Sequence, residues 1–206
     1  MTSPRILEQV PQYYEDRLAR YGVTAQGVDW NSEESLRLRF RELAGVLDDD
    51  EHVAVIDYGC GYGALAGYLR ERGHRGRYVG FDVSGAMIAA ARGLAADGGC
   101  TFVSERDELS PADYTLESGI FNVKQDTPSD EWRAYVLDTM HDLAALSRRG
   151  FAFNALTTYS DPERRRDDLY YADPLELFDY CKRHIAPRVS LLHATPLYEF
   201  SILVRL

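Results

Sequence analysis

The residues with the clearest chemical potential lie in the segment Asp57–Gly63, written DYGCGYG, directly after the apolar run at 53–56. Three glycines on alternate positions are unfavourable inside a strand, so they predict a loop that needs backbone freedom or a close approach to a ligand. A carboxylate two residues before the first glycine would repel a pyrophosphate and attract an ammonium group. The loop is therefore predicted to bind the cationic end of a small ligand, and the alternative is a tight turn between a strand and a helix.

The elements that must position this loop alternate between short apolar strands and amphipathic helices. Wholly apolar strands are typical of a parallel sheet buried on both faces, and the turn around Pro196 is too short for a crossover helix, so the last two strands must be antiparallel. The prediction is an α/β fold, a Rossmann-like doubly wound seven-stranded sheet with an antiparallel last strand. Strands are expected at 53–56, 78–81, 100–103, within 114–121, and at 150–156, 188–192 and 197–204, and helices at 65–72, 84–96, 132–146 and 174–184.

In the first 50 residues the spacing of apolar residues predicts helices alone, without the strands that alternate with helices in the rest of the chain. Residues 5–20 predict one helix, and a second is expected to begin near Asn31, with Glu34 completing a capping box, and to continue through Leu47. We therefore predict a single domain at 1–206, with an N-terminal helical cap at 1–50 and a Rossmann-like core at 51–206. Ligands of such sheets bind at the carboxyl ends of the strands, which is where the glycine loop falls.

The glycine-rich segment resembles the first motif of the class I S-adenosylmethionine (SAM)-dependent methyltransferases, in the small bacterial enzymes that act on small molecules. This resemblance implies SAM as the cofactor. It places the amino end of SAM near Asp57 and brings the backbone of Gly59, Cys60 and Gly61 close to its methionine part and ribose.

A second match to the same family is Asp82, at the end of the second predicted strand, where the family holds the two ribose hydroxyls. A carboxylate can accept two hydrogen bonds in a fork, which suits a vicinal diol, although an acid at this position could also simply stabilise a helix N-terminus. The resemblance implies that Val83 and Met87 border the adenine. Glu105 and Asp107 both compete for the place against the adenine amino group, and Glu105 is preferred.

The family resemblance extends to the N-terminal segment and to the end of the fourth strand. Residues 13–22 are similar to the aromatic cap segment of small-molecule methyltransferases, which implies that Tyr14 and Tyr21 cover the cofactor. Ser118 fills the position beside the methyl group. The sequence there, ESGIFN, lacks the Pro-Pro motif of many enzymes that methylate amino groups. Its absence argues against an amino group as the methyl acceptor.

The methyl acceptor is the least determined part of the site. Methyl transfer from a sulfonium needs mainly in-line alignment, and no histidine stands out as a general base. We predict that Asn122, Asp168 and Tyr171 contact the acceptor, because they follow the fourth and fifth strands on the ligand side. A turn or a solvated loop would explain the same residues.

Composition narrows the classes of partner. Over 206 residues the formal charge is -10, which disfavours nucleic acid and anionic membranes as partners. No apolar run approaches about 18 residues and no signal peptide is evident, so a cytoplasmic protein is expected. The three cysteines predict neither a disulfide framework nor a metal site. Oligomeric state stays open.

The function predicted from these residues is methyl transfer from SAM to a small-molecule metabolite, at oxygen. The first alternative is an NAD-dependent oxidoreductase, which the Asp57 carboxylate and the antiparallel tail oppose. The others are a SAM-binding module without an acceptor pocket and a methyltransferase that modifies a protein with a basic surface.

Overall fold

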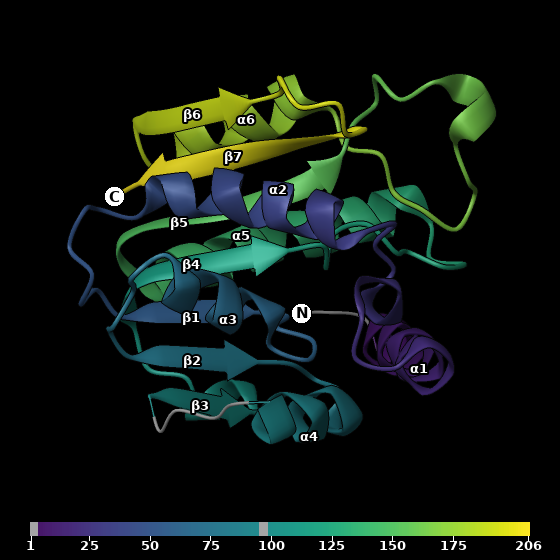
Figure 1. Cartoon of the computed structure of the whole chain (residues 1–206). Helices are drawn as coiled ribbons and strands as arrows, with labels where there is room; N and C mark the ends of the chain where they lie inside the picture. Colours follow the sequence, from purple (N-terminus) through teal and green to yellow (C-terminus); the bar gives the residue numbers. More distant parts are fainter. Residues whose placement is uncertain (1–3, 95–98) are drawn as a thin grey trace.

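A seven-stranded mixed sheet forms the centre of the molecule, with strand order β3-β2-β1-β4-β5-β7-β6 (Figure 1). The computed structural model describes residues 4–94 and 99–206. Strands β1 to β5 are mutually parallel, and β7 pairs antiparallel with both β5 and β6. This confirms the doubly wound sheet with an antiparallel finish. The strands are β1 (Val55–Tyr58), β2 (Tyr78–Phe81), β3 (Cys100–Val103), β4 (Ala112–Ser118), β5 (Ser147–Leu156), β6 (Arg188–Leu192) and β7 (Glu199–Arg205).

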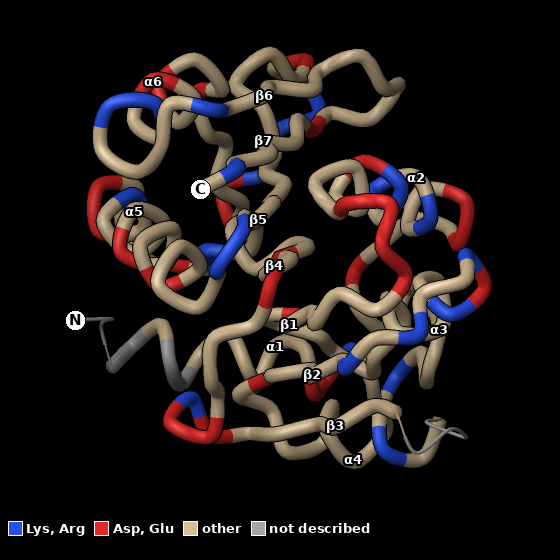
Figure 2. The backbone as a smooth tube through the Cα atoms, turned by 90° about the vertical axis from the view of Figure 1, so that its left-hand side faces the viewer, with Lys and Arg blue, Asp and Glu red and all other residues tan. Residues whose placement is uncertain are grey.

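Helices cover both faces of this sheet, and Figure 2 shows α2 and α3 on one side with α5 and α6 on the other. Separate apolar clusters lie on the two faces, because apolar residues of β5 and β7 alternate between the two sides of the sheet. Helix α1 lies apart from both layers, beside the carboxyl ends of the strands (Figure 1). The helices are α1 (Pro4–Tyr21), α2 (Glu33–Leu43), α3 (Ala64–Glu71), α4 (Gly85–Leu94), α5 (Ser129–Ala145) and α6 (Pro174–His184), with short 3-10 helices η1 (Ala25–Val28), η2 (Ala44–Val46), η3 (Arg106–Glu108) and η4 (Pro162–Arg164).

The second helix begins two residues later than the predicted Asn31 start. Ser32 is its N-cap: the Ser32 hydroxyl accepts from the Ser35 amide at 3.1 Å, and the Ser35 hydroxyl accepts from the Ser32 amide at 3.3 Å. The predicted capping box was therefore wrong by one residue, with serine in the place given to Glu34. The α-helix also ends at Leu43, because the chain tightens into η2 before Leu47.

Two strand boundaries differ from the sequence prediction in ways that matter for the site. β1 runs to Tyr58, so Asp57 belongs to the strand and not to the loop. β4 begins at Ala112, two residues before the segment 114–121 in which it was expected, and ends at Ser118, because Gly119 has φ +99°, a left-handed value that ends the extended conformation. The predicted end of α4 at Ala96 lies outside the described residues.

Within the described residues, no helix combines the length and the apolar character needed to cross a membrane.

Candidate active site

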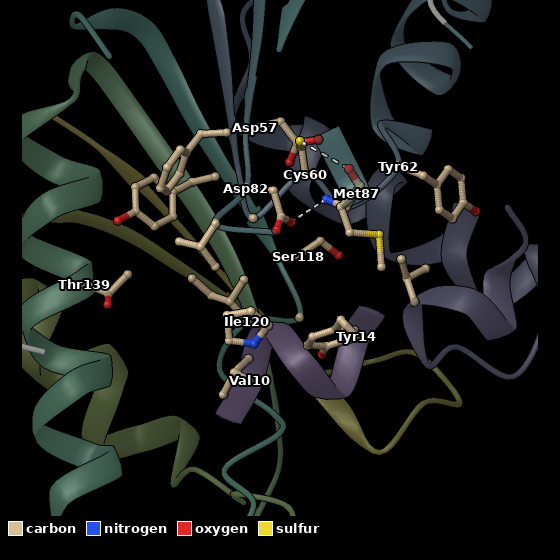
Figure 3. Close-up of a pocket in the computed structure, with 18 of the residues that line it drawn as sticks. Val10, Tyr14, Asp57, Cys60, Tyr62, Asp82, Met87, Ser118, Ile120 and Thr139 are labelled. Carbon is tan, nitrogen blue, oxygen red and sulfur yellow. Dashed lines mark hydrogen bonds between the residues drawn. The ribbon is translucent and has the colours of Figure 1, made fainter. Parts of the chain in front are cut away.

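A cavity of about 600 Å³ opens at the carboxyl ends of β1, β2 and β4, under the N-terminal elements. Its walls come from α1, η1, α2, the glycine loop and α5. Figure 3 shows Thr139 and Tyr62 toward opposite ends of this cavity and Asp82 between them. A volume of this size suits a small molecule, and its position at the switch point of the sheet is where ligands of this fold bind.

The glycine loop is pinned to the end of β2 and crowded by neighbours. The amides of Gly59 and Cys60 both donate to the carbonyl of Phe81, at 2.8 and 2.9 Å. Gly59 has φ +83°, and a Cβ placed on it would lie 2.2 Å from Cγ2 of Ile120. The loop therefore needs glycine at position 59 both for its backbone conformation and for the close approach of the segment after β4.

Asp82 presents a carboxylate at the middle of the cavity, held in place from two sides. Its Oδ2 accepts from the Gly61 amide at 2.8 Å and its Oδ1 accepts from the Ser84 amide at 2.9 Å. The residue is half-buried and lines the cavity, so each oxygen keeps lone pairs for a ligand. Removal from solvent raises its pKa, while the two backbone hydrogen bonds oppose that rise. A carboxylate fixed in this way can accept one hydrogen bond from each of two neighbouring hydroxyl groups.

Asp57 is more deeply placed, with only 2% of its surface exposed. The Tyr78 hydroxyl donates to its Oδ2. Burial raises the pKa of Asp57 to about 7; the Tyr78 hydrogen bond lowers this pKa, and the negative charge of Asp82 raises it. Two carboxylates facing one poorly solvated cavity disfavour each other's ionisation, so a cationic ligand group would relieve their repulsion.

Helix α1 forms the roof, and Tyr14 is the aromatic residue that it contributes to the cavity. Side-chain hydrogen bonds hold the helix there. Glu15 accepts from the Ser84 hydroxyl at 2.9 Å, and the Tyr13 hydroxyl donates to Asp29 at 2.7 Å. Tyr21, the other tyrosine predicted to cover the cofactor, is 37% exposed at the end of α1 and does not belong to the described cavity lining. Tyr21 shares the helical face of Tyr14 but lies two turns further along α1, about 10 Å along the helix axis, at the last residue of the helix.

The remaining residues predicted to touch the cofactor gather around the same space. Of the two competing acids after β3, Glu105 lines the cavity, whereas Asp107 lies within η3 and is absent from the described lining. The other predicted residues that line the cavity are Cys60, Val83, Met87 and Ser118.

Sequence reasoning missed the end of the cavity that α5 forms. Tyr58, Tyr135 and Thr139 line it, and the Arg106 guanidinium donates to the carboxylate of Asp142 there. Arg106 and Asp142 are 36 residues apart in sequence, so no local pattern could connect them. The helical spacing of Tyr135 and Thr139 predicts that both lie on the buried face of α5, but it does not predict that they line a cavity.

The three residues predicted to contact the acceptor lie outside the described cavity lining. Asn122 Oδ1 accepts from the Leu156 amide at 3.0 Å, which ties the loop after β4 to the end of β5. Asp168 pairs with Arg166, whose amide donates to the Tyr171 hydroxyl at 3.0 Å. The structure thus brings Asn122, Asp168 and Tyr171 onto two neighbouring loops, where each is engaged by the protein itself. Their contact with an acceptor stays a prediction.

No three His, Cys, Asp or Glu side chains among residues 4–94 and 99–206 gather closely enough to hold a metal ion.

Comparison with known proteins links this geometry to a family. The chain matches the methyltransferase domain model over residues 55–143. It is 51% identical over 161 residues to a Mycobacterium tuberculosis protein provisionally named a methyltransferase, covering 78% of this chain and 97% of that protein.

Among solved structures, it resembles magnesium protoporphyrin IX methyltransferase from Synechocystis with bound S-adenosylhomocysteine (SAH), with a TM-score of 0.69 and 19% identity over 97% of this chain and 99% of that one. It also resembles 1,6-didemethyltoxoflavin N1-methyltransferase from Burkholderia thailandensis, with a TM-score of 0.59 and 22% identity over 95% of this chain and 89% of that one. At these identities the two structures support the fold alone.

Proposed function

Because the chain belongs to the class I SAM-dependent methyltransferases, we propose that it transfers the methyl group of SAM to an oxygen atom of a small-molecule acceptor. The cofactor of this family supplies a methyl group already bonded to a good leaving group, a sulfonium sulfur.

The observation that carries the proposal is the pair of carboxylates, Asp57 and Asp82, that lines one cavity at the ends of β1 and β2. Asp82 has the fixed fork that a ribose diol requires, and Asp57 is a buried carboxylate whose ionised form a cationic amine would stabilise. The residues present therefore fit both ends of SAM.

Catalysis in this proposal is mainly a matter of position. Gly59 and Gly61 let the chain approach the methionine part, Tyr14 closes the roof, and Ser118 stands at the end of β4 where the methyl group is expected. An enclosed site of this kind keeps water from the sulfonium and holds an acceptor in line with the breaking bond.

Two features support a small, oxygen-bearing acceptor. The cavity is enclosed by the cap on one side and by α5 on the other, which suits a small molecule better than a protein segment. The loop after β4 reads Ser118-Gly-Ile-Phe121, and it lacks the Pro-Pro motif typical of enzymes that methylate amino groups.

For Asn122, Asp168 and Tyr171 we propose an indirect part in acceptor binding, through the two loops that they hold together. Their bonds to Leu156 and Arg166 fix those loops beside the carboxyl ends of β4 and β5. The cytoplasm is the proposed compartment, since Cys60 and Cys181 are free thiols that lie buried in the core.

A thermal-shift comparison of SAM, SAH and NAD tests the cofactor assignment. Ligands that bind only the native state raise the melting temperature. We expect SAM and SAH to stabilise the protein and NAD to leave it unchanged; stabilisation by NAD alone would instead support the oxidoreductase.

Incubation with methyl-labelled SAM and an extract of the source cells tests the reaction. Label in the small-molecule fraction supports the proposal, and label in protein supports a protein methyltransferase. SAM binding without any transfer would indicate a non-catalytic module.

A further inference from the structure

Three buried polar atoms without a protein partner gather where β4, β5 and α2 meet. They are the Ser118 hydroxyl oxygen, Oδ1 of Asn154 and Nη1 of Arg39, and none of them has a hydrogen-bond partner among the described residues. Asn154 is 1% exposed and Arg39 is 5% exposed. Buried polar side-chain atoms are nearly always hydrogen-bonded in proteins, so three on one wall point to a ligand or to ordered water.

Two of these three atoms belong to side chains that share the Glu199 carboxylate, namely Arg39 and Asn154. Arg39 Nε donates to Oε2 of Glu199 at 2.7 Å and its Nη2 donates to Oε1 at 2.5 Å. Asn154 Nδ2 donates to the same Oε2 at 2.7 Å. Since a carboxylate can only accept, the amide nitrogen of Asn154 must face Glu199, and its Oδ1 is left as a free acceptor. Arg39 likewise keeps Nη1 as a free donor.

Two residues next to this hydrogen-bonded network, Ser118 and Trp30, line the cavity. Ser118 lines the cavity and lies directly opposite Asn154 in the register of β4 and β5, so both side chains point to the same face of the sheet. Trp30 also lines the cavity, and its ring covers the Arg39 guanidinium at 3.8 Å. We call Ser118, Asn154, Arg39 and Glu199 the polar wall.

Charge balance on this wall restricts what can bind there. The Arg39 guanidinium and the Glu199 carboxylate neutralise each other in a two-bond pair, and Ser118 and Asn154 are uncharged. A charged ligand group would find no uncompensated partner, whereas a neutral group that both donates and accepts would satisfy the free atoms.

We propose that the polar wall is the acceptor-binding site, and that it takes a neutral hydroxyl or amide group of the methyl acceptor through Ser118 and Asn154. This inference rests on the proposed function. It adds that the acceptor is an uncharged molecule, and it assigns acceptor binding to residues on α2, β5 and β7 that no sequence motif marked.

The first test asks whether the acceptor is charged. A small-molecule extract is passed over anion- and cation-exchange resins, and each fraction is incubated with the full-length protein and methyl-labelled SAM. We expect the acceptor to appear in the flow-through of both resins. Retention of all acceptor activity on either resin overturns the proposal.

The second test uses Ser118→Ala and Asn154→Ala, with Ser190→Ala on the exposed strand β6 and Asn31→Ala as matched controls. We expect kcat/KM for the flow-through fraction to fall at least about tenfold in the two wall variants and to stay unchanged in the controls. SAH binding, measured by calorimetry, should stay within about twofold in Asn154→Ala and in the two controls. Equal kcat/KM in wall and control variants overturns the proposal.

A binding readout separates acceptor binding from folding and from chemistry. The flow-through fraction should raise the melting temperature of the SAH-loaded protein further, and Asn154→Ala should lose that second increment while keeping the increment due to SAH. Loss of both increments marks a general defect and counts against a specific role. Failure of the unmodified protein to bind SAM or to transfer label refutes the proposed function itself, and this inference with it.

Discussion

The hydrogen bond from Tyr78 to the buried Asp57 carboxylate should control the pH dependence of SAM binding. A cationic ligand favours ionised Asp57, so SAM affinity should increase as the pH rises toward the Asp57 pKa of about 7 and then level off. The Tyr78 hydroxyl stabilises the ionised form, because it donates to that carboxylate.

Tyr78→Phe removes this donor and leaves the ring in the core. A hydrogen bond to a charged group contributes about 1.5–3 kcal/mol, and one pKa unit corresponds to about 1.4 kcal/mol, so the pKa of Asp57 should rise by roughly 1–2 units. If only ionised Asp57 binds SAM, the apparent Kd at pH 7 should increase about 5- to 50-fold.

The assay is titration calorimetry with SAM between pH 5.5 and 7.5, a range in which the ligand's own α-amino group stays mostly protonated. Between pH 7 and 7.5 the unmodified protein should gain only about 1.5-fold in affinity, whereas Tyr78→Phe should gain about threefold. Tyr114→Phe is the control, since Tyr114 is also buried in the sheet but lies against Arg149. A flat profile for the unmodified protein, or the same profile for both variants, would refute the reasoning.

The raised pKa of Asp57 also affects the stability of the ligand-free protein. The folded-state pKa of Asp57 lies above its usual 3.8, so the native state binds more protons than the unfolded state between pH 4 and 7. Asp57 therefore contributes a decrease in unfolding free energy as the pH rises through this range, of the order of 4 kcal/mol. Urea denaturation of Asp57→Asn should lack this contribution.

Three further substitutions test the site and its supports. Asp82→Asn should weaken SAM binding roughly 10- to 100-fold in calorimetry, because the amide cannot accept a hydroxyl hydrogen bond at both of its heavy atoms. Gly119→Ala should lower the unfolding free energy in urea by roughly 2–4 kcal/mol, since its Cβ would lie 2.5 Å from Cζ2 of Trp30 at φ +99°. Arg39→Met should lower it by about 3–5 kcal/mol, because it leaves Glu199 buried and unpaired.

Each of these changes has a matched control in the chain. Asp107→Asn removes an exposed acid after β3 and should leave SAM binding unchanged. Gly67→Ala adds a methyl group where no atom lies within 4 Å, and in the middle of α3 it should be neutral or stabilising. Arg37→Met removes an exposed ion pair with Glu71 and should change stability little. Effects in the controls as large as in the test variants would contradict the assigned contacts.

The sequence by itself determined the sheet and the cofactor end of the site, because both depend on local patterns. Short apolar runs specified the parallel strands, and the brief turn around Pro196 required an antiparallel pair. Asp57 lies near the end of β1, Gly59 and Gly61 lie in the loop after it, and Asp82 directly follows β2. The carboxyl ends of these strands meet at one edge, so strand order alone brings the four residues to one cavity.

Helix limits were less determined by sequence because they depend on single hydrogen bonds. Ser32, Ser35 and Glu34 are all plausible capping residues, and only the relative energy of the competing bonds selected the two serines. Tyr14 and Tyr21 share one face of α1, so only the docking of α1 against α4 and η1 decided which of them lies over the cavity.

Only the tertiary structure decided the environment of the site. The Tyr78 bond to Asp57 spans 21 residues, and the Arg39 pair with Glu199 spans 160 residues and joins α2 to the final strand. Burial and electrostatic contacts of this kind arise from the packing of distant segments, which no local pattern encodes. The chain therefore specifies a SAM-type loop by its local spacing, whereas the fold alone determines how that loop is charged and which polar atoms stand beside it.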